Sequence, residues 1–350
     1  MSNLRMSPKN DVRSVFAEAR WVPMHLEPAR RELQLLWLPR EVHASVPFLT
    51  TQYLGTVGAP VARLKFDELY QAASSAARPA HYIFHSAFCC STLLARALDL
   101  PGVAMGLKEP QILNELAAQM RARQLSRELL DGVTRLLGRP FGPGEAIVIK
   151  PSNEANLLIE QLLRGDERSK AILLYAPLPR FLRSVAGKGM WGRIWGRRLF
   201  GLLRGEGMPS FVFSNAELFE QTDLQVAGLA WLLHHWQFGA LLARFPKRLR
   251  ILDSETFLAD RAQCLRKIGE HFELGIDAAG WARIADSRVF GEHSKQIGRR
   301  FESGAEERSA QPTALVDDEI DKVSVWIDAV ARSIGLSLVP PLGAQLVPRP

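Results

Sequence analysis

A short apolar run followed at once by a helical pattern is the feature that most constrains this chain. Residues 81–84 have the character of a buried strand, and 91–98 that of a helix seated on a sheet. A helix that begins at Ser91 leaves its first N–H groups unpaired and carries the positive end of its dipole. After a tight turn from a strand, such groups can bind a phosphate. The segment 81–98 therefore indicates either a phosphate-binding loop of an α/β domain or a structural helix with Ser91 as its N-cap.

Strand-like and helical runs alternate downstream, which predicts a parallel sheet covered by helices. The further strands are predicted at 103–107, 146–149, 171–175 and 249–252. Helices are predicted from Pro110 through Leu137, from Ser152 or Asn153, and at 179–185, 226–243, 262–272 and 317–334. Ligands of open parallel sheets bind at the carboxyl ends of the strands. The candidate functional residues are therefore those at the strand ends: 84–90, Glu109, Lys150, 175–184 and 253–255.

The predicted domain boundaries fall at changes in composition. Residues 1–78 have the character of an N-terminal extension, with short apolar runs punctuated by prolines. The linker 73–79 leads into a main domain at 79–338. The tail, 339–350, is rich in proline and is expected to be irregular.

Composition limits the class of protein. The chain has 350 residues, is 47% hydrophobic, and has three cysteines, of which Cys89 and Cys90 are neighbours. That cysteine usage favours a reducing compartment, and with no apolar leader visible we expect a cytoplasmic protein. The most apolar window, 226–243, contains His234, His235 and Gln237, which favours a buried helix over a membrane span. A net charge of +7 fits an anionic ligand.

Other kinds of site are disfavoured. No Cys/His cluster has zinc spacing, and the adjacent His234 and His235 cannot share a helix face, so we expect no metal. No nucleic-acid-binding module is present, so no nucleic-acid partner is expected. Cys89 and Cys90 suit a tight turn, although a reactive thiol at a helix N-terminus is the alternative. The loop is not a Walker A motif, because it lacks glycine and has no lysine before Thr92.

The loop resembles the 5′-phosphosulfate loop of the sulfotransferase family, in its bacterial and protein-tyrosine branches. That loop has the form Gly-x-Pro-Arg-Ser-Gly-Thr-Thr-Leu-Leu after a strand. Laid without gaps on residues 85–94, the family's threonine pair falls on Ser91 and Thr92. The fold implied is a P-loop NTPase-like parallel sheet flanked by helices.

Further segments resemble the family in the same order along the chain. Leu107-Lys-Glu-Pro110 lies where the tyrosine-sulfating branch has its catalytic base, and 147–152 resembles a strand ending in Leu-Lys-Ser-Pro. Residues 172–184 resemble the 3′-phosphate motif, 248–260 a later strand with an acidic turn, and 289–295 a C-terminal piece of bacterial members. Together they cover about residues 80–300.

The resemblance implies 3′-phosphoadenosine 5′-phosphosulfate as co-substrate, an acceptor that the sequence does not identify, and no metal. It assigns catalysis to Glu109 and Lys150. Glu109 is equally explained as a charge near a helix N-terminus. For Lys150 the alternative is a lysine that reaches solvent, and the resemblance favours ligand contact. The implied co-substrate-binding residues are Ala87, Phe88, Cys89, Cys90, Ser91, Thr92, Arg180 and Ser184.

Two positions depart from the family pattern. Phe88 stands where the family has the Lys or Arg of the loop, and Ala176 where it has the 3′-phosphate arginine. Arg180 or Arg183 could supply the second cation, and Lys108 or Lys150 the first. Since sulfuryl transfer leaves charge on the departing phosphate, a kinase-like enzyme or a non-catalytic nucleotide-binding protein remains an alternative.

A basic, aromatic stretch at 187–204 holds five cations and no acid, interleaved with Trp191, Trp195 and Phe200. It suits a lid over the nucleotide, a surface for an anionic acceptor, or contact with a membrane surface. Its five glycines favour a mobile loop over a stable helix, so a lid or an acceptor-contact loop is expected.

Overall fold

The computed structural model describes residues 12–55, 58–71, 79–205, 209, 213–291 and 314–348. The chain divides into two compact units. Among the described residues, unit 1 comprises those within 1–83 and 92–170, and unit 2 those within 84–91, 171–293 and 298–350. The predicted boundaries at 78 and 338 remain a prediction.

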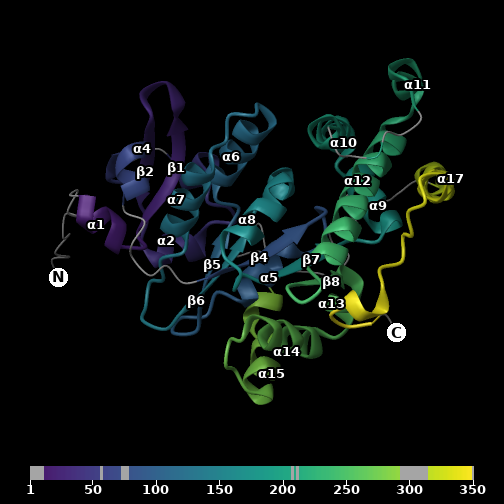
Figure 1. Ribbon diagram of the computed structural model, residues 1–350. Helices are drawn as coiled ribbons and strands as arrows, with labels where there is room; N and C mark the ends of the chain where they lie inside the picture. The colour runs from purple at the N-terminus through teal and green to yellow at the C-terminus, as the bar shows by residue number, and fades with distance from the viewer. Residues whose placement is uncertain are drawn as a thin grey trace. The chain divides into compact units, whose positions relative to one another are not determined.

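A five-stranded sheet with the order β5-β6-β4-β7-β8 forms the core (Figure 1). The strands are β4 (Ala80–His85), β5 (Ala104–Lys108), β6 (Ala146–Lys150), β7 (Ala171–Tyr175) and β8 (Leu249–Asp253). The pairs β4–β6, β5–β6 and β7–β8 are parallel. Every residue of β4, β5 and β7 is buried, as expected for strands covered on both faces. The prediction of an α/β fold with a parallel sheet flanked by helices is confirmed, and each predicted strand is found.

The extension of unit 1 contains a second sheet, which the sequence patterns did not predict. Its antiparallel strands, in the order β1-β2-β3, are β1 (Trp21–Glu27), β2 (Glu32–Trp37) and β3 (Val61–Lys65). The short helices of this region are α1 (Val12–Ala17), η1 (Pro28–Arg30), α2 (Arg40–Ser45), α3 (Thr51–Leu54) and α4 (Phe66–Gln71). Strand β1 packs on two helices of the same unit, α6 (Gln111–Arg121) and α7 (Arg127–Leu137). Trp21 and Met24 are completely buried, so this sheet shares a core with α6 and α7.

The single long helix expected through Leu137 is wrong, because the chain forms α6 and α7 instead. Helix α6 ends at Arg121, and Arg123 adopts a left-handed conformation with φ of 57°. Ser126 then caps α7 by accepting a hydrogen bond from Leu129 N at 3.2 Å. The helix expected after Lys150 starts as the 3-10 helix η2 (Asn153–Leu158) and continues as α8 (Ile159–Gly165).

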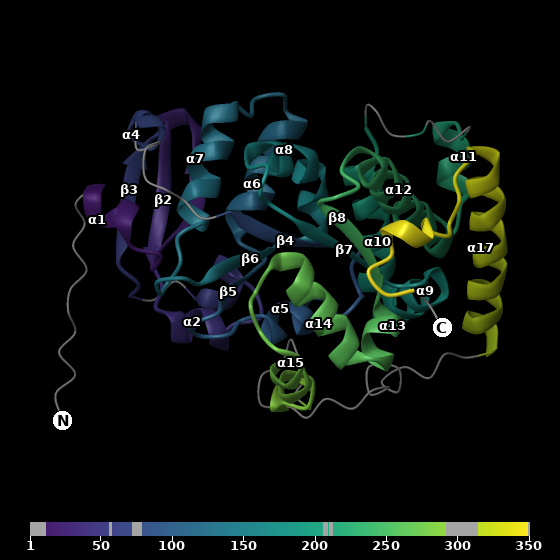
Figure 2. The ribbon, with the colours of Figure 1, turned by 60° about the horizontal axis from the view of Figure 1, so that its bottom comes forward.

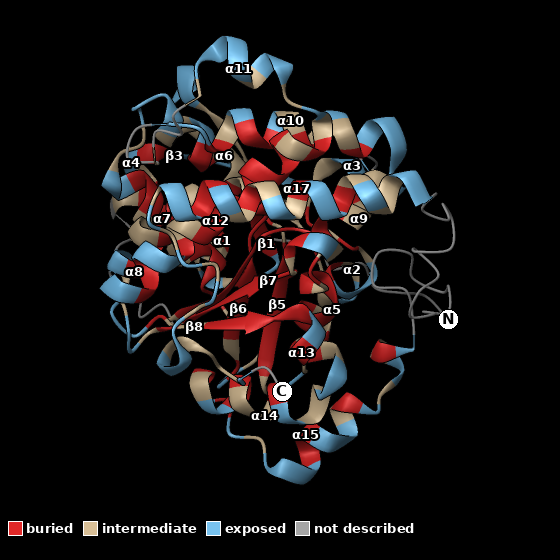
Figure 3. Ribbon diagram, turned by 90° about the vertical axis from the view of Figure 1, so that its right-hand side faces the viewer, coloured by how far each residue is buried: buried red, intermediate tan, exposed pale blue. Residues whose placement is uncertain are grey.

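Unit 2 is built around one long buried helix, α12 (Asp223–Arg244). Besides β7 and β8, the unit contains the described helices α9 (Leu178–Gly187), α10 (Gly189–Leu203), α11 (Asn215–Glu220), α13 (Ser254–Ala259), α14 (Arg261–Phe272), α15 (Ala278–Ala285), η3 (Arg288–Phe290), α17 (Ala314–Ser333) and η4 (Leu342–Ala344). Helix α12 packs against α9, α10, α17 and β8, which explains its apolar composition. Helix α17 buries one face and exposes the other (Figure 3). Helices α14 and α15 pack on each other (Figure 2).

The expectation of a mobile loop at 187–204 is also wrong, since residues 189–203 form α10. Two of its glycines are required by close packing. A Cβ at Gly192 would lie 2.1 Å from the carbonyl oxygen of Val185, and one at Gly196 would lie 2.8 Å from the Cβ of Ala227 on α12. Tertiary packing thus overrides the low helix propensity of glycine.

The proline-rich tail is not irregular throughout. Gln345 forms a parallel bridge with Ile251 of β8, and Leu346 N donates to the Ile251 carbonyl at 2.9 Å. The tail therefore extends the edge of the sheet in unit 2. Within the described residues, no helix has the length and apolarity needed to cross a membrane.

Candidate active site

The loop between β4 and α5 (Ser91–Ala97) has an unusual backbone for a segment without glycine. Ala87, Phe88 and Cys90 have φ values of 74°, 51° and 61°. Each left-handed residue with a Cβ costs roughly 1–2 kcal/mol. Such strain persists where the surrounding structure imposes it, and it clusters at ligand-binding sites. Left-handed residues within a turn can also point successive N–H groups into an anion-binding concavity.

Hydrogen bonds within unit 2 hold the start of this loop. Ser86 N donates to Leu174 O at 3.1 Å, and the Ser86 hydroxyl accepts from Ala176 N at 3.2 Å. The carbonyl of Ala176 accepts from Trp231 Nε1 at 2.8 Å. Ala176 is completely buried. The position where the family resemblance would have an arginine therefore has a structural role in this chain.

Phe88 belongs to an aromatic cluster of unit 2. Its ring centroid lies 4.9 Å from that of Trp195 and 5.8 Å from that of Phe181. The ammonium of Lys188, at the C-terminal end of α9, lies 5.5 Å from the Phe88 centroid. Phe88 thus has a cation above its ring.

Helix α9 carries both arginines that the sequence offered as the second cation, Arg180 and Arg183, and their contacts differ. Arg183 forms an ion pair with Asp317 of α17 at 2.8 Å. Arg180 and Ser184 are four residues apart, and thus on one helix face, and both are half-buried. Neither side chain makes a hydrogen bond or ion pair with another residue in the described ranges. Arg180, rather than Arg183, is therefore the available cation of α9.

In unit 1, Lys150 lies at the carboxyl end of β6 with its side chain only 1% exposed. Its ammonium forms an ion pair with Glu109 and donates to the Thr92 hydroxyl, at 3.4 Å, in the first turn of α5. It also lies 5.2 Å from the ring centroid of Phe48. The alternative that Lys150 reaches solvent is wrong, because its charge is buried among these partners.

Glu109 directly follows β5 and has a strained backbone, with φ of 49°. Its N–H donates to Lys150 O at 2.6 Å. The N-cap of α6 is Pro110, and no side chain caps that helix. Glu109 therefore precedes the helix, and its carboxylate pairs with Lys150 instead of capping α6.

Lys108 forms a register pair with Lys150 on the neighbouring strand, yet its contacts differ. Its ammonium donates to Ala44 O in α2 at 3.2 Å. Burial lowers the pKa of Lys108 to about 8, with a partly opposing effect from Asp99. Of the two lysines considered as replacements for the loop cation, Lys150 is the one joined to the first turn of α5.

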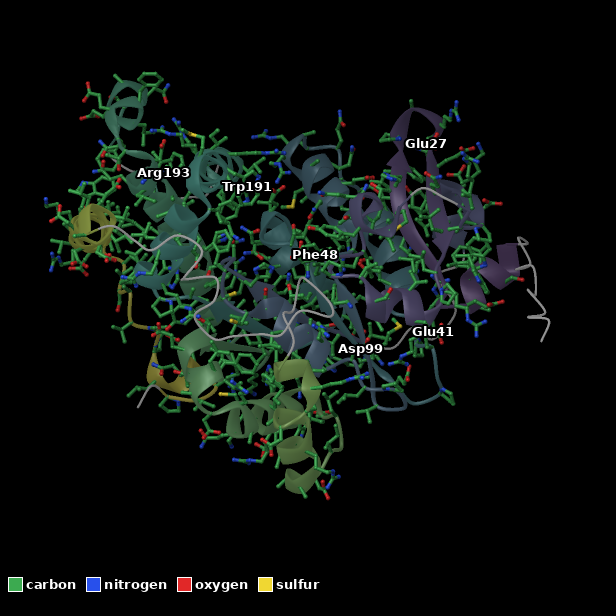
Figure 4. All side chains as sticks on the ribbon, turned by 180° about the vertical axis from the view of Figure 1, so that it is seen from behind. Glu27, Glu41, Phe48, Asp99, Trp191 and Arg193 are labelled. Carbon is green, nitrogen blue, oxygen red and sulfur yellow. The ribbon has the colours of Figure 1, made fainter. Side chains whose placement is uncertain are left out.

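Sequence reasoning missed the contribution of the N-terminal extension. Leu49 N donates to Lys108 O at 2.7 Å, and Leu49 O accepts from Gln111 N at 3.0 Å. These bonds hold the neighbouring Phe48, labelled in Figure 4, beside Lys150. The only signal was the apolar run at 46–54, which showed no partner in the sequence.

The remaining candidates are structural in their contacts. His235 Nδ1 donates to Trp231 O at 3.1 Å and stacks on the Trp231 ring, while burial lowers the pKa of His234 to about 3. Cys89 is buried and Cys90 half-buried, and neither is part of a disulfide bond. In the parts of the chain that the structure describes, no three His, Cys, Asp or Glu side chains gather as metal ligands would.

Comparisons with known proteins find a likeness at the level of the structure. No protein-family model matches the chain, and no curated protein matches it. A solved structure titled "Sulfotransferase Domain from the Curacin Biosynthetic Pathway" is similar over 75% of this chain and 100% of that one, at 14% identity and a TM-score of 0.42.

Proposed function

We propose that this protein is a sulfotransferase that uses 3′-phosphoadenosine 5′-phosphosulfate and a hydroxyl or amine acceptor. The observation that carries the proposal is the group formed by Lys150, Glu109 and Thr92. These residues come from the ends of β6 and β5 and from the first turn of α5. A buried cation joined both to a carboxylate and to a helix that follows a strained loop suits the transfer of an anionic group.

Glu109 is proposed as the general base. The acceptor oxygen or nitrogen attacks sulfur while its proton passes to the Glu109 carboxylate. The bond between sulfur and the bridging oxygen breaks, and its electron pair leaves with adenosine 3′,5′-bisphosphate. The strained backbone of Glu109 and its 19% exposed side chain fit a positioned carboxylate that substrate can reach.

Lys150 is proposed to stabilise the charge that develops on the departing phosphate. Residues 87–92 would bind the 5′-phosphosulfate through backbone N–H groups and the hydroxyls of Ser91 and Thr92. Arg180 and Ser184, which share a face of α9, are assigned to the 3′-phosphate. Lys188, above Phe88, is a second cation for the loop.

A thermal-shift titration of the full chain tests the nucleotide. Adenosine 3′,5′-bisphosphate without magnesium is expected to raise the melting temperature, since a ligand that binds only the folded state stabilises it. A response only to ATP with magnesium would replace the proposal with a kinase-like enzyme. No response to either nucleotide would overturn nucleotide binding altogether.

Arg180 and Arg183 form a matched pair for the same titration. Arg180→Ala is expected to weaken the shift about tenfold in ligand concentration, because it removes a charged hydrogen-bond donor. Arg183→Ala loses an ion pair with Asp317 and should leave ligand response unchanged. The reverse outcome would reject the assignment of Arg180.

Glu109→Gln tests catalysis separately from binding. The variant should keep the nucleotide-induced shift while acceptor-dependent release of adenosine 3′,5′-bisphosphate falls about 10²- to 10⁴-fold. Full release by Glu109→Gln would exclude this residue as the base. A wild-type protein that binds the nucleotide but transfers to no hydroxyl or amine acceptor would favour the non-catalytic alternative.

A further inference from the structure

Helix α10 exposes an apolar stripe at its N-terminal end. Met190, Trp191 and Ile194 are 70%, 60% and 59% exposed. The spacings of three and four residues place them on one side of the helix. Trp191, labelled in Figure 4, stacks on Trp195 with the ring centroids 6.3 Å apart and the planes 15° from parallel. Three large apolar side chains gathered on one turn of a helix differ from the scattered exposed residues that are normal on a surface.

Packing within unit 2 fixes the direction of this stripe. Gly192 and Gly196 lie on the buried face of α10, against Val185 and Ala227. Because no larger side chain fits at those positions, α10 cannot rotate to bury the stripe. The exposure of Met190, Trp191 and Ile194 is therefore built into the fold.

The charges around the stripe are positive. The segment 187–204 has five cations and no acid. Three of the five have partners: Arg193 with Glu319, Arg197 with Asp223, and Arg204 with Asn215. Lys188 and Arg198, one near each end of the stripe, are exposed and form no ion pair with any residue that the structure describes.

We propose that this stripe docks the protein on an anionic phospholipid surface. Met190 and Ile194 would enter the boundary between headgroups and acyl chains, where an amphipathic helix lies in the plane of the membrane. A tryptophan suits the same depth because its ring is apolar with one polar edge. Lys188 and Arg198 would meet lipid phosphates at the level of the headgroups. This inference does not require sulfuryl transfer, although it shares Lys188 with the proposed co-substrate site.

Vesicle co-sedimentation of the full chain tests the docking. The wild type is expected to bind vesicles containing about one third phosphatidylserine at least tenfold more strongly than vesicles of phosphatidylcholine alone. High salt should reduce that preference, because it screens the cations. Equal binding to both vesicles, or binding to neither, would overturn the proposal.

Two substitutions on α10 locate the surface. Ile194→Asp puts a carboxylate into the stripe, and Arg198→Glu reverses one of the unpaired cations. Each is expected to lower the bound fraction about tenfold on anionic vesicles without lowering the melting temperature. Val325→Asp is the matched control, since Val325 is 71% exposed on α17, outside the stripe.

The control also defines the contrary outcomes. Equal loss of vesicle binding in Val325→Asp and Ile194→Asp would show that no specific surface is used. A concentration-dependent dimer of the wild type that Ile194→Asp abolishes, together with absent vesicle binding, would assign the stripe to a second copy of this chain. Either result would reject membrane docking.

Discussion

Lys150 in unit 1 and Phe88 in unit 2 are each energetically unfavourable for the fold, but for different physical reasons. Lys150 is a buried charge, 1% exposed, which is compensated by Glu109 and Thr92. Phe88 is an apolar side chain packed on Phe181 and Trp195, and the cost there lies in a left-handed backbone. Both arrangements cost more free energy than a purely structural role requires. An apolar side chain at position 150 would avoid the buried charge, and a glycine at position 88 would avoid the backbone strain.

The difference shows what each region can contribute to a ligand. The Lys150 group offers a fixed charge and a carboxylate in a setting of low dielectric, where electrostatic interactions are strong. The loop offers a backbone shape, while Lys188, the cation above the Phe88 ring, is exposed. Substitutions near Lys150 should therefore change the free energy of unfolding through charge, and those near Phe88 through backbone conformation and packing.

The largest expected effect is that of Lys150→Ala. This variant leaves the Glu109 carboxylate, which is 19% exposed, without its ammonium partner. Breaking a buried pair costs about 3–5 kcal/mol in free energy of unfolding. Urea denaturation of the wild type and the variant measures this difference.

A double variant distinguishes charge from packing. Lys150→Met combined with Glu109→Gln removes both charges and should recover most of the lost stability. If the double variant is as unstable as Lys150→Ala, packing rather than charge dominates at Lys150. In that case the proposed contrast between the two regions would not hold.

For the neighbouring Lys108, unlike Lys150, the charged form should destabilise the folded protein. Its pKa in the folded protein is about 8, below the value of 10.5 for an unhindered lysine. Between these values the unfolded chain binds more protons than the folded one, so stability rises with pH through this window. The full difference corresponds to about 3 kcal/mol.

Urea midpoints near the two ends of this window measure the effect. The Lys108→Met variant lacks the titrating group and should show a smaller rise in stability than the wild type. An identical rise in both proteins would show that other groups cause it. A fall in stability specific to the wild type would contradict the sign.

The third prediction concerns the glycines of α10, where close packing should determine the effect of a substitution by alanine. Gly192→Ala would bring a Cβ to 2.1 Å from the Val185 carbonyl oxygen, so we expect a loss of about 1–3 kcal/mol. Gly201 has no atom within 4 Å of an added Cβ, so Gly201→Ala should stabilise by up to about 1 kcal/mol. Thermal melting of both variants tests this contrast. Equal effects at the two positions would mean that helix propensity, and not close packing, controls α10.

These two regions also show how far the sequence could be interpreted. Short apolar runs located β4 to β8, and strand ends brought Glu109 and Lys150 into consideration. Their mutual contact could not be predicted, because it depends on the register of β5 with β6. The sheet of the extension was missed because its alternating patterns are short and its partners, α6 and α7, are distant in sequence.

Glycine misled the sequence interpretation in both directions. In α10 it suggested mobility, whereas Gly192 and Gly196 are small so that helices can approach. In the loop its absence concealed the left-handed residues Ala87 and Phe88. The intrinsic propensity of a residue describes which backbone conformations it can adopt, and tertiary contacts decide which of them the folded protein uses.

The smallest expected effect is that of Ala87→Gly, and it tests the strain directly. Glycine would relieve about 1–2 kcal/mol at a φ of 74°. It would also lose about 0.5–1 kcal/mol in backbone entropy and about 0.8 kcal/mol for the buried methyl group. These effects nearly cancel, so the free energy of unfolding should change by less than about 0.5 kcal/mol. Ala329→Gly, at an exposed position of α17, has no strain to relieve and should lose about 0.5–1 kcal/mol. Urea denaturation compares them, and a larger loss at Ala87 than at Ala329 would mean that the loop backbone is unstrained.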